Sequence, residues 1–469
     1  MKITTVNHED RYSLEQIACL FLERDSEALI TSELTEDNFI KTEIKLENMV
    51  CEASYKADCK DVRSFKNSVK KSAYLAMKKL KGSDIPWGTL TGIRPTKFCR
   101  ELGDKYSYEE IRNILTEDYW VSDKKADFCL EVTKNSQKLI NRIKPEEIGV
   151  YIGVPFCPSR CSYCSFVSES SALYKKYIPE YTEALKKEIL STAEFSRKYG
   201  LKPISLYIGG GTPPTLGTKG LAEVIDTALN GFSINPSDVE FTVEAGRPDI
   251  IDEELLSVLS AKGVNRLCIN PQTMNDKTLK LIGRNHNTAQ TEKAFSLARS
   301  FGFGNINSDL IAGLPEEGIE EFSYSLERIG ELSPEGITVH TMYLKRTAEI
   351  TKEKKWDSCG KDIEEMLDFA YDYTKNNGYA PYYMYKQRST VGNQENTGYA
   401  KAGYESIYNS AIMEEVQTIL ACGAGASTKI AGNDIERVYN IKDAFSYIRD
   451  IDDIVVKKEE KLKSIFGKR

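Results

Sequence analysis

A repeated alternation of short apolar segments and amphipathic helical segments most constrains how this 469-residue chain can fold. It begins at about Gly149, and helical spacing is visible between the apolar segments, as in Tyr181, Leu185 and Ile189. The six candidate strands cover residues 150–154, 204–208, 239–243, 266–269, 306–311 and 337–343. Strands that each lead into a helix pair in parallel through right-handed crossovers, so the pattern predicts an α/β barrel or an open partial barrel.

Three cysteines follow the first candidate strand with the spacing C-x3-C-x2-C, at Cys157, Cys161 and Cys164. Iron–sulfur clusters are normally closed by four thiolates, so three on one loop would leave one iron of a four-iron cluster open to another ligand. A structural zinc site would need a second ligand pair, but the other eight cysteines are scattered singly. We therefore expect a [4Fe–4S] cluster here and buried, structural roles for the scattered cysteines.

Length and composition limit the possible classes of protein. The length predicts two or three domains. Proteins that bind nucleic acids usually carry an excess of basic residues, whereas this chain has a net charge of -7, so we expect no nucleic-acid partner. No apolar segment is long enough to span a membrane, and the N-terminus has no signal-like region. With an odd number of cysteines, these features predict a reduced, cytoplasmic protein.

We predict three domains along the chain. Residues 1–145 form an accessory α+β domain, in which strands at 2–6, 28–33 and 39–55 and a helix at 14–22 suggest a β-α-β-β unit. The partial barrel occupies residues 146–380. A mixed or helical C-terminal domain, residues 381–469, is expected to cover the barrel opening.

Glycine-rich or polar motifs lie at the ends of the candidate strands. Residues 209–214, Gly-Gly-Gly-Thr-Pro-Pro, follow the second strand, and Glu244 ends the third. Gln272 follows the fourth strand, and Asp309 lies on the fifth, before Ala-Gly-Leu-Pro at 312–315. The carboxyl ends of parallel strands meet at one edge of a sheet, so we expect these groups to converge on one ligand site.

Together these motifs resemble the radical S-adenosylmethionine (SAM) enzymes of the oxygen-independent coproporphyrinogen III oxidase family. The strings that carry the resemblance lie at 151–166, 209–213, 271–272, 282–286, 309–315 and 423–427. The resemblance runs from about Gly149 to Asp450 and is closest to the HemZ-type branch. The strings typical of that branch lie at 86–97, 243–249 and 381–396.

The resemblance implies a partial (β/α)6 TIM-like barrel that binds a [4Fe–4S] cluster and one or two molecules of SAM. It implies cluster ligation by Cys157, Cys161 and Cys164 and a catalytic role for Tyr151. The implied cofactor-binding residues are Tyr151, Tyr163, Gly210, Gly211, Thr212, Glu244, Gln272, Arg284 and Asp309. The implied reaction is oxidative decarboxylation of the propionates of coproporphyrinogen III to vinyl groups in heme biosynthesis, with a one-electron donor such as a ferredoxin or flavodoxin.

A tetrapyrrole substrate would bring several carboxylates, so we expect cations at the barrel mouth. The candidates are Arg94, Lys97, Arg100, Lys345, Arg346, Lys386 and Arg388. Gly153 and Phe166 stand where the best-known branch of the family has a histidine and a fourth cysteine. Two alternatives stay open: a heme-binding chaperone of the same family, and a radical SAM enzyme acting on heme or another substrate.

Overall fold

The computed structural model describes residues 1–23, 25–164, 169–343, 360–387, 390–432 and 434–467. The chain divides into two compact units, both discontinuous in sequence. Unit 1 comprises residues 1–133 and 385–395, and unit 2 comprises residues 134–384 and 396–469. The three-domain division expected from the sequence stays a prediction. Within the described ranges, no helix is long and apolar enough to cross a membrane.

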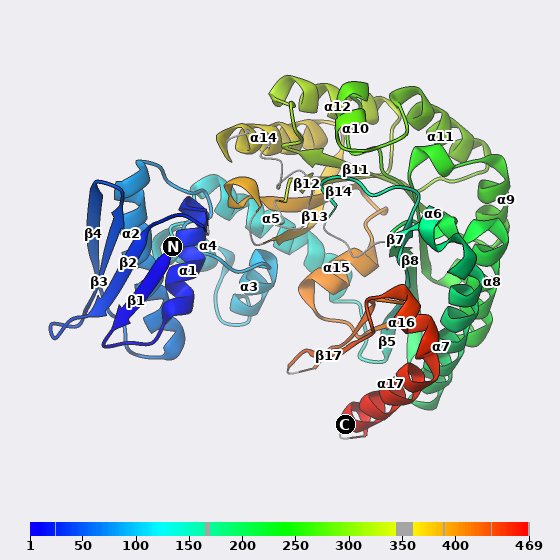
Figure 1. Ribbon diagram of the computed structural model, residues 1–469, viewed down its shortest axis with the longest axis horizontal. Coiled ribbons are helices and arrows are strands. Elements are labelled where there is room, and N and C mark those ends of the chain that lie inside the picture. Colours follow the sequence, from blue (N-terminus) through cyan, green and yellow to red (C-terminus); the bar gives the residue numbers. More distant parts are fainter. Residues whose placement is uncertain (24, 165–168, 344–359, 388–389, 433, 468–469) are drawn as a thin grey trace. The chain divides into compact units, whose positions relative to one another are not determined.

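Unit 1 is built on a four-stranded sheet in the order β1-β2-β3-β4. Its strands are β1 (Lys2–Val6), β2 (Leu29–Leu34), β3 (Phe39–Leu46) and β4 (Met49–Lys56). Its helices are α1 (Arg11–Phe21), α2 (Val62–Lys81), α3 (Pro95–Leu102), α4 (Tyr108–Asn113) and the first part of α5 (Asp123–Ile140). Figure 1 shows α1 and α2 on one face of the sheet. Their apolar side chains form the core of the unit together with those of the strands.

The sequence-based prediction of a single strand over residues 39–55 is wrong. That stretch forms two antiparallel strands, β3 and β4, with Leu46 paired to Met49. The reversal occurs at Glu47, whose φ of 53° lies in the left-handed region that a tight turn requires. The apolar alternation runs through both strands, so it does not mark this turn.

Unit 2 contains six parallel strands that neighbour one another in chain order, and this confirms the predicted fold class. They are β5 (Glu147–Val154), β8 (Lys202–Gly210), β9 (Glu240–Gly246), β10 (Arg266–Ile269), β11 (Ile306–Ala312) and β12 (Gly336–Thr341). The helices between and after them include α7 (Ile178–Lys198), α8 (Gly217–Gly231), α9 (Glu253–Ala261), α10 (Asp276–Leu281), α11 (Thr288–Ser300), α12 (Ile319–Glu331) and α14 (Gly360–Asn376). Figure 1 shows α7, α8, α9 and α11 along the outer side of these strands.

Side chains alternate between the two faces of the parallel strands. In β5, Val150, Ile152 and Val154 are fully buried in the core shared with the outer helices. Tyr151 and Gly153 therefore point to the inner face, as the two-residue period of a strand requires. The pairing of β5 with β8 sets Tyr151 beside Tyr207 and Gly153 beside Gly209, so the inner face carries the candidate site residues.

The parallel strands do not close on themselves in the described part of unit 2. Antiparallel β14 (Glu395–Lys401) pairs with β12, and parallel β15 (Ile419–Cys422) pairs with β5. Beyond them lie β13 (Tyr379–Lys386) at one end of the sheet and β16 (Ser427–Ile430) and β17 (Glu436–Tyr439) at the other. The six-stranded core is therefore extended at both edges, which gives an open, partial barrel.

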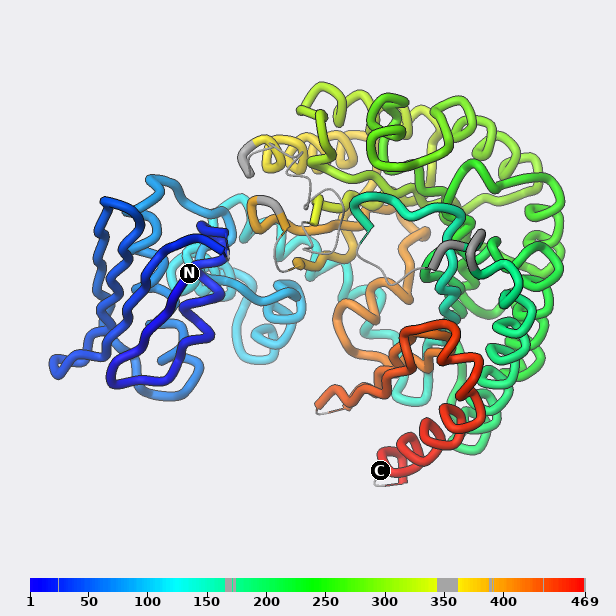
Figure 2. The backbone as a smooth tube through the Cα atoms, in the orientation of Figure 1, coloured from blue at the N-terminus to red at the C-terminus, as the bar shows by residue number. Residues whose placement is uncertain are grey.

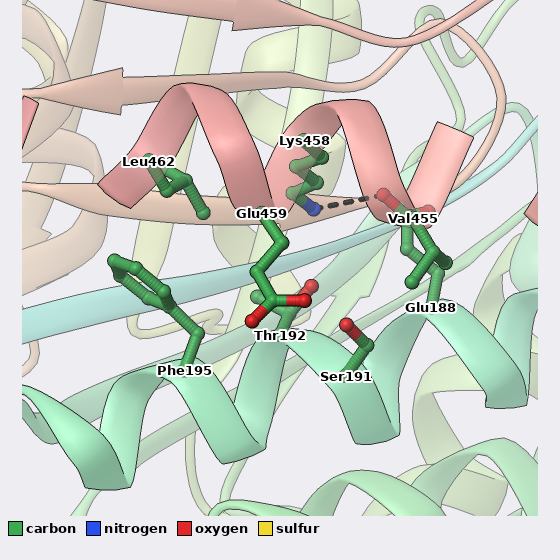
Figure 3. Close-up of a pocket in the computed structure, with 8 residues that line it drawn as sticks. All are labelled: Glu188, Ser191, Thr192, Phe195, Val455, Lys458, Glu459 and Leu462. Carbon is green, nitrogen blue, oxygen red and sulfur yellow. Dashed lines mark hydrogen bonds and ion pairs between the residues drawn. The ribbon is translucent and has the colours of Figure 1, made fainter. Parts of the chain in front are cut away.

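The C-terminal helices α15 (Ile407–Glu414), α16 (Ala444–Arg449) and α17 (Ile451–Phe466) complete unit 2, and Figure 2 shows the last of them returning alongside α7. A buried ion pair joins α7 to α17, with Lys458 Nζ 2.8 Å from Glu188 Oε1 (Figure 3). Glu188 also accepts hydrogen bonds from Gly423 N (2.8 Å), Tyr447 Oη (2.6 Å) and Asn440 Nδ2 (2.7 Å). One carboxylate therefore ties the C-terminal elements to α7 and to the loop that follows β15.

Candidate functional site

The three-cysteine loop begins where β5 ends, and its three cysteines are partly exposed and form no disulfide in the described part of the chain. A backbone hydrogen bond from Cys164 N to Cys161 O (3.1 Å) makes a turn between these two ligands. Cys157 Sγ accepts a hydrogen bond from Thr212 Oγ1 at 3.5 Å. Phe166 lies outside the described residues.

The glycine run after β8 lies directly against the cysteine loop. Gly211 N donates to Val154 O and Thr212 N donates to Phe156 O, both at 2.7 Å. A Cβ on Gly211 would stand 2.5 Å from Phe156 O and 3.0 Å from Cys157 Sγ. Glycine is therefore required here because the two segments approach too closely for any side chain.

Glu244 lies on the inner face of β9, beside the glycine run. Its Oε1 accepts a 2.6 Å hydrogen bond from Tyr207 Oη, and a Cβ on Gly209 would fall 2.9 Å from the carboxyl group. Burial raises the pKa of Glu244 to about 7, and the negative charge of Asp309 acts in the same direction. Glu244 can therefore gain or lose a proton near neutral pH at the centre of the site.

Tyr151 belongs to a stack of three aromatic rings on the inner face. Tyr408, from α15, stacks on Tyr207 with ring centroids 4.5 Å apart and on Tyr151 at 6.3 Å. Burial raises the pKa of Tyr151, which keeps its hydroxyl protonated. Tyr408 could not be expected from the sequence, because no motif surrounds it and its partners lie more than 200 residues earlier.

Gln272, just after β10, meets Asp309 in the middle of β11. Gln272 N donates to Asp309 O (3.0 Å), and Gln272 adopts a left-handed φ of 76°. The Asp309 carboxylate accepts from Asn307 Nδ2 at 2.8 Å and lies 3.7 Å from His340 Nε2. Burial alone would raise the pKa of Asp309, but the contacts with His340 and Asn307 outweigh it and lower that pKa.

Arg284 reaches the site from a loop after α10, whereas most of the other motifs follow strands directly. Its Nη2 and Nε donate to Tyr163 Oη at 2.9 and 3.3 Å, and its Nη1 donates to Asn270 O at 3.0 Å. A Cβ on the adjacent Gly283 would stand 3.4 Å from Arg160 O. The segment that presents Arg284 is therefore packed against the cysteine loop.

Two further residues, Arg247 and His286, lie near Asp249, and no role was expected for either from the sequence. The Arg247 guanidinium binds Ser159 and Asp249, and its side chain is only 4% exposed. His286 is buried 3.9 Å from Asp249, and burial lowers the pKa of this imidazole to about 4, so it stays neutral. Both residues lie within the strings at 243–249 and 282–286, but only the folded chain brings Arg247 to the cysteine loop and His286 to Asp249.

The substrate-binding cations expected from the sequence fall into separate groups. Arg94, Lys97 and Arg100 lie at or in α3 of unit 1, whereas Lys345, Arg346 and Arg388 lie outside the described residues. Lys386 is buried in unit 1, where Nζ donates to Leu90 O (3.2 Å) and lies 4.7 Å from the centre of the Trp87 ring. The expectation that Lys386 faces a substrate is therefore wrong, because these contacts enclose its ammonium group.

The chemistry of the donor set fits an iron–sulfur cluster. Within the described residues, no three Cys, His, Asp or Glu side chains converge on a position for a single metal ion. A four-iron cluster does not need such convergence, because each thiolate binds a different iron. Three cysteines that are not disulfide-bonded, on a loop in contact with Gly211, Gly283 and Thr212, supply that arrangement.

Comparison with known proteins places the chain in a family. Residues 151–329 match the Radical SAM superfamily. The oxygen-independent coproporphyrinogen-III oxidase-like protein HemZ of Bacillus subtilis is 37% identical over 426 residues, which cover 88% of this chain and 85% of HemZ. The heme chaperone HemW of the same organism is 30% identical, over 63% of this chain and 74% of HemW.

A solved structure has the same fold. Coproporphyrinogen III oxidase (HemN) from Escherichia coli, a radical SAM enzyme, matches 67% of this chain and 71% of its own, with a TM-score of 0.54 and 24% identity. Radical SAM proteins use a [4Fe–4S] cluster together with SAM. The chain belongs to the radical SAM superfamily, in the family of the oxygen-independent coproporphyrinogen-III oxidase-like protein HemZ.

Proposed function

We propose that this chain is a radical SAM oxidoreductase that converts propionate side chains of coproporphyrinogen III to vinyl groups. The observation that carries the proposal is the packing of Gly211 and Gly283 against a loop with three cysteines outside any disulfide, next to the partly buried Glu244 and the buried Arg284. The similarity to HemZ over most of both chains supports the choice of substrate. A tetrapyrrole and a ferredoxin or flavodoxin are the proposed partners.

Each residue of the site has a physical role in this proposal. Cys157, Cys161 and Cys164 hold the cluster, which together with SAM supplies one-electron radical chemistry when bound. Gly210 and Gly211 leave room for the cofactor to approach the backbone. The planar guanidinium of Arg284, oriented by Tyr163 and Asn270, suits the carboxylate of one or two bound SAM molecules.

The inner face of the barrel positions the rest of the cofactor. Glu244 offers carboxylate oxygens to hydroxyl or amine donors, and Asp309 and Gln272 add acceptors at the neighbouring strand ends. Thr212 donates to a cluster thiol. Tyr151 lines the site as the first ring of the aromatic stack and excludes water from it.

Anaerobic reconstitution tests the proposal. The reconstituted chain, supplied with a reductant and SAM, is expected to form 5′-deoxyadenosine and to convert coproporphyrinogen III to a tricarboxylate or vinyl product. A Cys161→Ala variant is expected to lose both the cluster and the activity. Formation of 5′-deoxyadenosine without any decarboxylated product would reject this substrate and retain the radical chemistry on heme or another molecule.

A heme chaperone is the second candidate, favoured by the 30% identity to HemW. In this chain, however, residues 395–400 lack the histidine and tryptophan that the resemblance associates with the chaperone branch. Glu395 is instead buried in unit 1 and binds Lys125 Nζ at 2.6 Å and Trp87 Nε1 at 2.7 Å. A hemin titration followed by the Soret band is expected to show no tight stoichiometric binding, and a one-to-one complex would favour the chaperone.

A further inference from the structure

Arg247 connects the segment after β9 to the cysteine loop. It follows β9 directly, after Gly246, whose φ of 71° turns the chain at the strand end. Its Nη1 donates to Ser159 Oγ at 2.6 Å and approaches Ser159 O at 3.4 Å. Ser159 lies inside the cysteine loop, between Cys157 and Cys161.

The hydroxyl group of Ser159 also forms a hydrogen bond with the segment just before Arg284. Ser159 Oγ accepts from Arg247 and donates its own proton to Gly283 O at 3.3 Å. On the other side of the loop, Ser162 N donates to Ile282 O at 3.1 Å. The loop is therefore held at Ser159 and Ser162 by the segment that carries Arg284 into the site.

The guanidinium is itself fixed in one orientation. Its Nε and Nη2 each lie 3.0 Å from an oxygen of Asp249 and form a bidentate ion pair with that carboxylate. Such pairs restrict a guanidinium in both position and plane. The side chain of Asp249 is only 15% exposed, so solvent screens the pair weakly.

We propose that Arg247 is a positioning residue for the cluster loop, which it holds through Ser159, with Asp249 fixing its guanidinium. This inference rests on the proposed cluster site. Outer contacts of this kind orient metal ligands, and their loss typically weakens metal retention about 10–100-fold. Lysine can replace arginine only in part here, because one ammonium group cannot form two parallel hydrogen bonds to Asp249 and also reach Ser159.

The test compares cluster retention in the reconstituted full-length chain. Arg247→Ala and Ser159→Ala are each expected to speed loss of the cluster to a chelator by about 10-fold or more, followed by visible absorbance and iron content. The double variant is expected to lose the cluster no faster than the more affected single variant, because both substitutions remove the same hydrogen bond between Arg247 and Ser159. Arg247→Lys is expected to restore retention only in part.

Arg299→Ala is the matched control, because Arg299 makes a comparable forked pair with Glu335 elsewhere in unit 2. It is expected to retain the cluster at the wild-type rate, even where its thermal unfolding shifts as far as that of Arg247→Ala.

Wild-type retention in Arg247→Ala and Ser159→Ala, or effects that multiply in the double variant, would overturn the role of Arg247. Failure of the wild-type chain to take up any cluster would instead reject the proposed function. If Arg247→Ala does not fold, the rate at which Ser159→Ala loses the cluster still tests the role of the hydrogen bond between the two residues.

Discussion

Gly211 shows how one residue links the glycine run to the cysteine loop. A single methyl group added here meets backbone, which cannot move aside as a flexible side chain would. Gly304 in the same unit has open space around its Cβ position and no positive φ, so it serves as a comparison for the loss of glycine alone.

We expect Gly211→Ala to lower the free energy of unfolding by about 1–3 kcal/mol, as for other overpacked sites, and to impair cluster uptake. Gly304→Ala is expected to match the wild type in both respects. Chemical denaturation of the apo chain and iron content after reconstitution measure the two effects. Normal cluster uptake by Gly211→Ala would contradict the close approach of the two segments.

The protonation of Glu244 should affect how the stability of the chain depends on pH. Its pKa rises from 4.5 to about 7 on folding, so the folded chain binds a proton that the unfolded chain releases. This contribution therefore makes the free energy of unfolding fall as pH rises from about 4.5 to 7, and it levels off above that range.

We expect Glu244→Gln to remove this part of the pH dependence in denaturation series of the apo chain. Tyr207→Phe deletes the hydrogen bond that favours the charged carboxylate, so it should shift the fall in stability to higher pH. Identical pH profiles for the wild type and Glu244→Gln would show that this carboxyl group does not titrate as described.

At the scale of elements, α17 is held to α7 by two ion pairs in different surroundings. Lys458 and Glu188 are both buried, and Figure 3 shows them paired beside a small pocket lined by Thr192, Phe195 and Leu462. Lys187 and Asp452 join the same two helices, but their side chains are 52% and 76% exposed. The two pairs therefore allow burial to be compared on one helix interface.

We expect Lys458→Met to cost about 3–5 kcal/mol of unfolding free energy, because it leaves the Glu188 carboxylate buried without its cation. Lys187→Met should remain close to the wild type, since water already screens the exposed pair. Urea denaturation of both variants measures the difference. Equal effects would mean that burial of the Lys458 pair does not determine its contribution.

At the scale of the whole molecule, unit 1 is completed by a segment from late in the chain. Residues 385–395 bring Lys386 and Glu395 into its interior. Glu395 and Lys125 have side chains that are 3% and 4% exposed and lie 2.6 Å apart. The integrity of unit 1 therefore depends on residues more than 250 positions away in sequence.

We expect Glu395→Gln to destabilise unit 1 by several kcal/mol, roughly 3–5, because Lys125 would be left buried without a counter-charge. Hydrogen exchange of the full chain should accelerate around Trp87 and along α5, and much less in β8 and β9 of unit 2. Unchanged exchange near Trp87 would show that the segment 385–395 does not stabilise unit 1.

The amino-acid sequence by itself determined the alternation of strands and helices, and hence the parallel sheet, because the periods of strand and helix are local properties. The spacing of Cys157, Cys161 and Cys164 likewise indicated the cluster chemistry, since ligands on one short loop are close in any fold. Local patterns did not mark the turn at Glu47, because the alternation of side chains continues through both strands.

Only the tertiary structure decided which distant residues surround these motifs. The stacking of Tyr408 on Tyr207, the connection of Arg247 to Ser159 and the burial of Lys386 each join segments with no shared local signal. The same holds for the open edges of the barrel, where β15 pairs with the first of the six parallel strands and β14 with the last. Such contacts depend on the path of the whole chain, because packing and hydrogen bonding act between neighbours in space rather than in sequence.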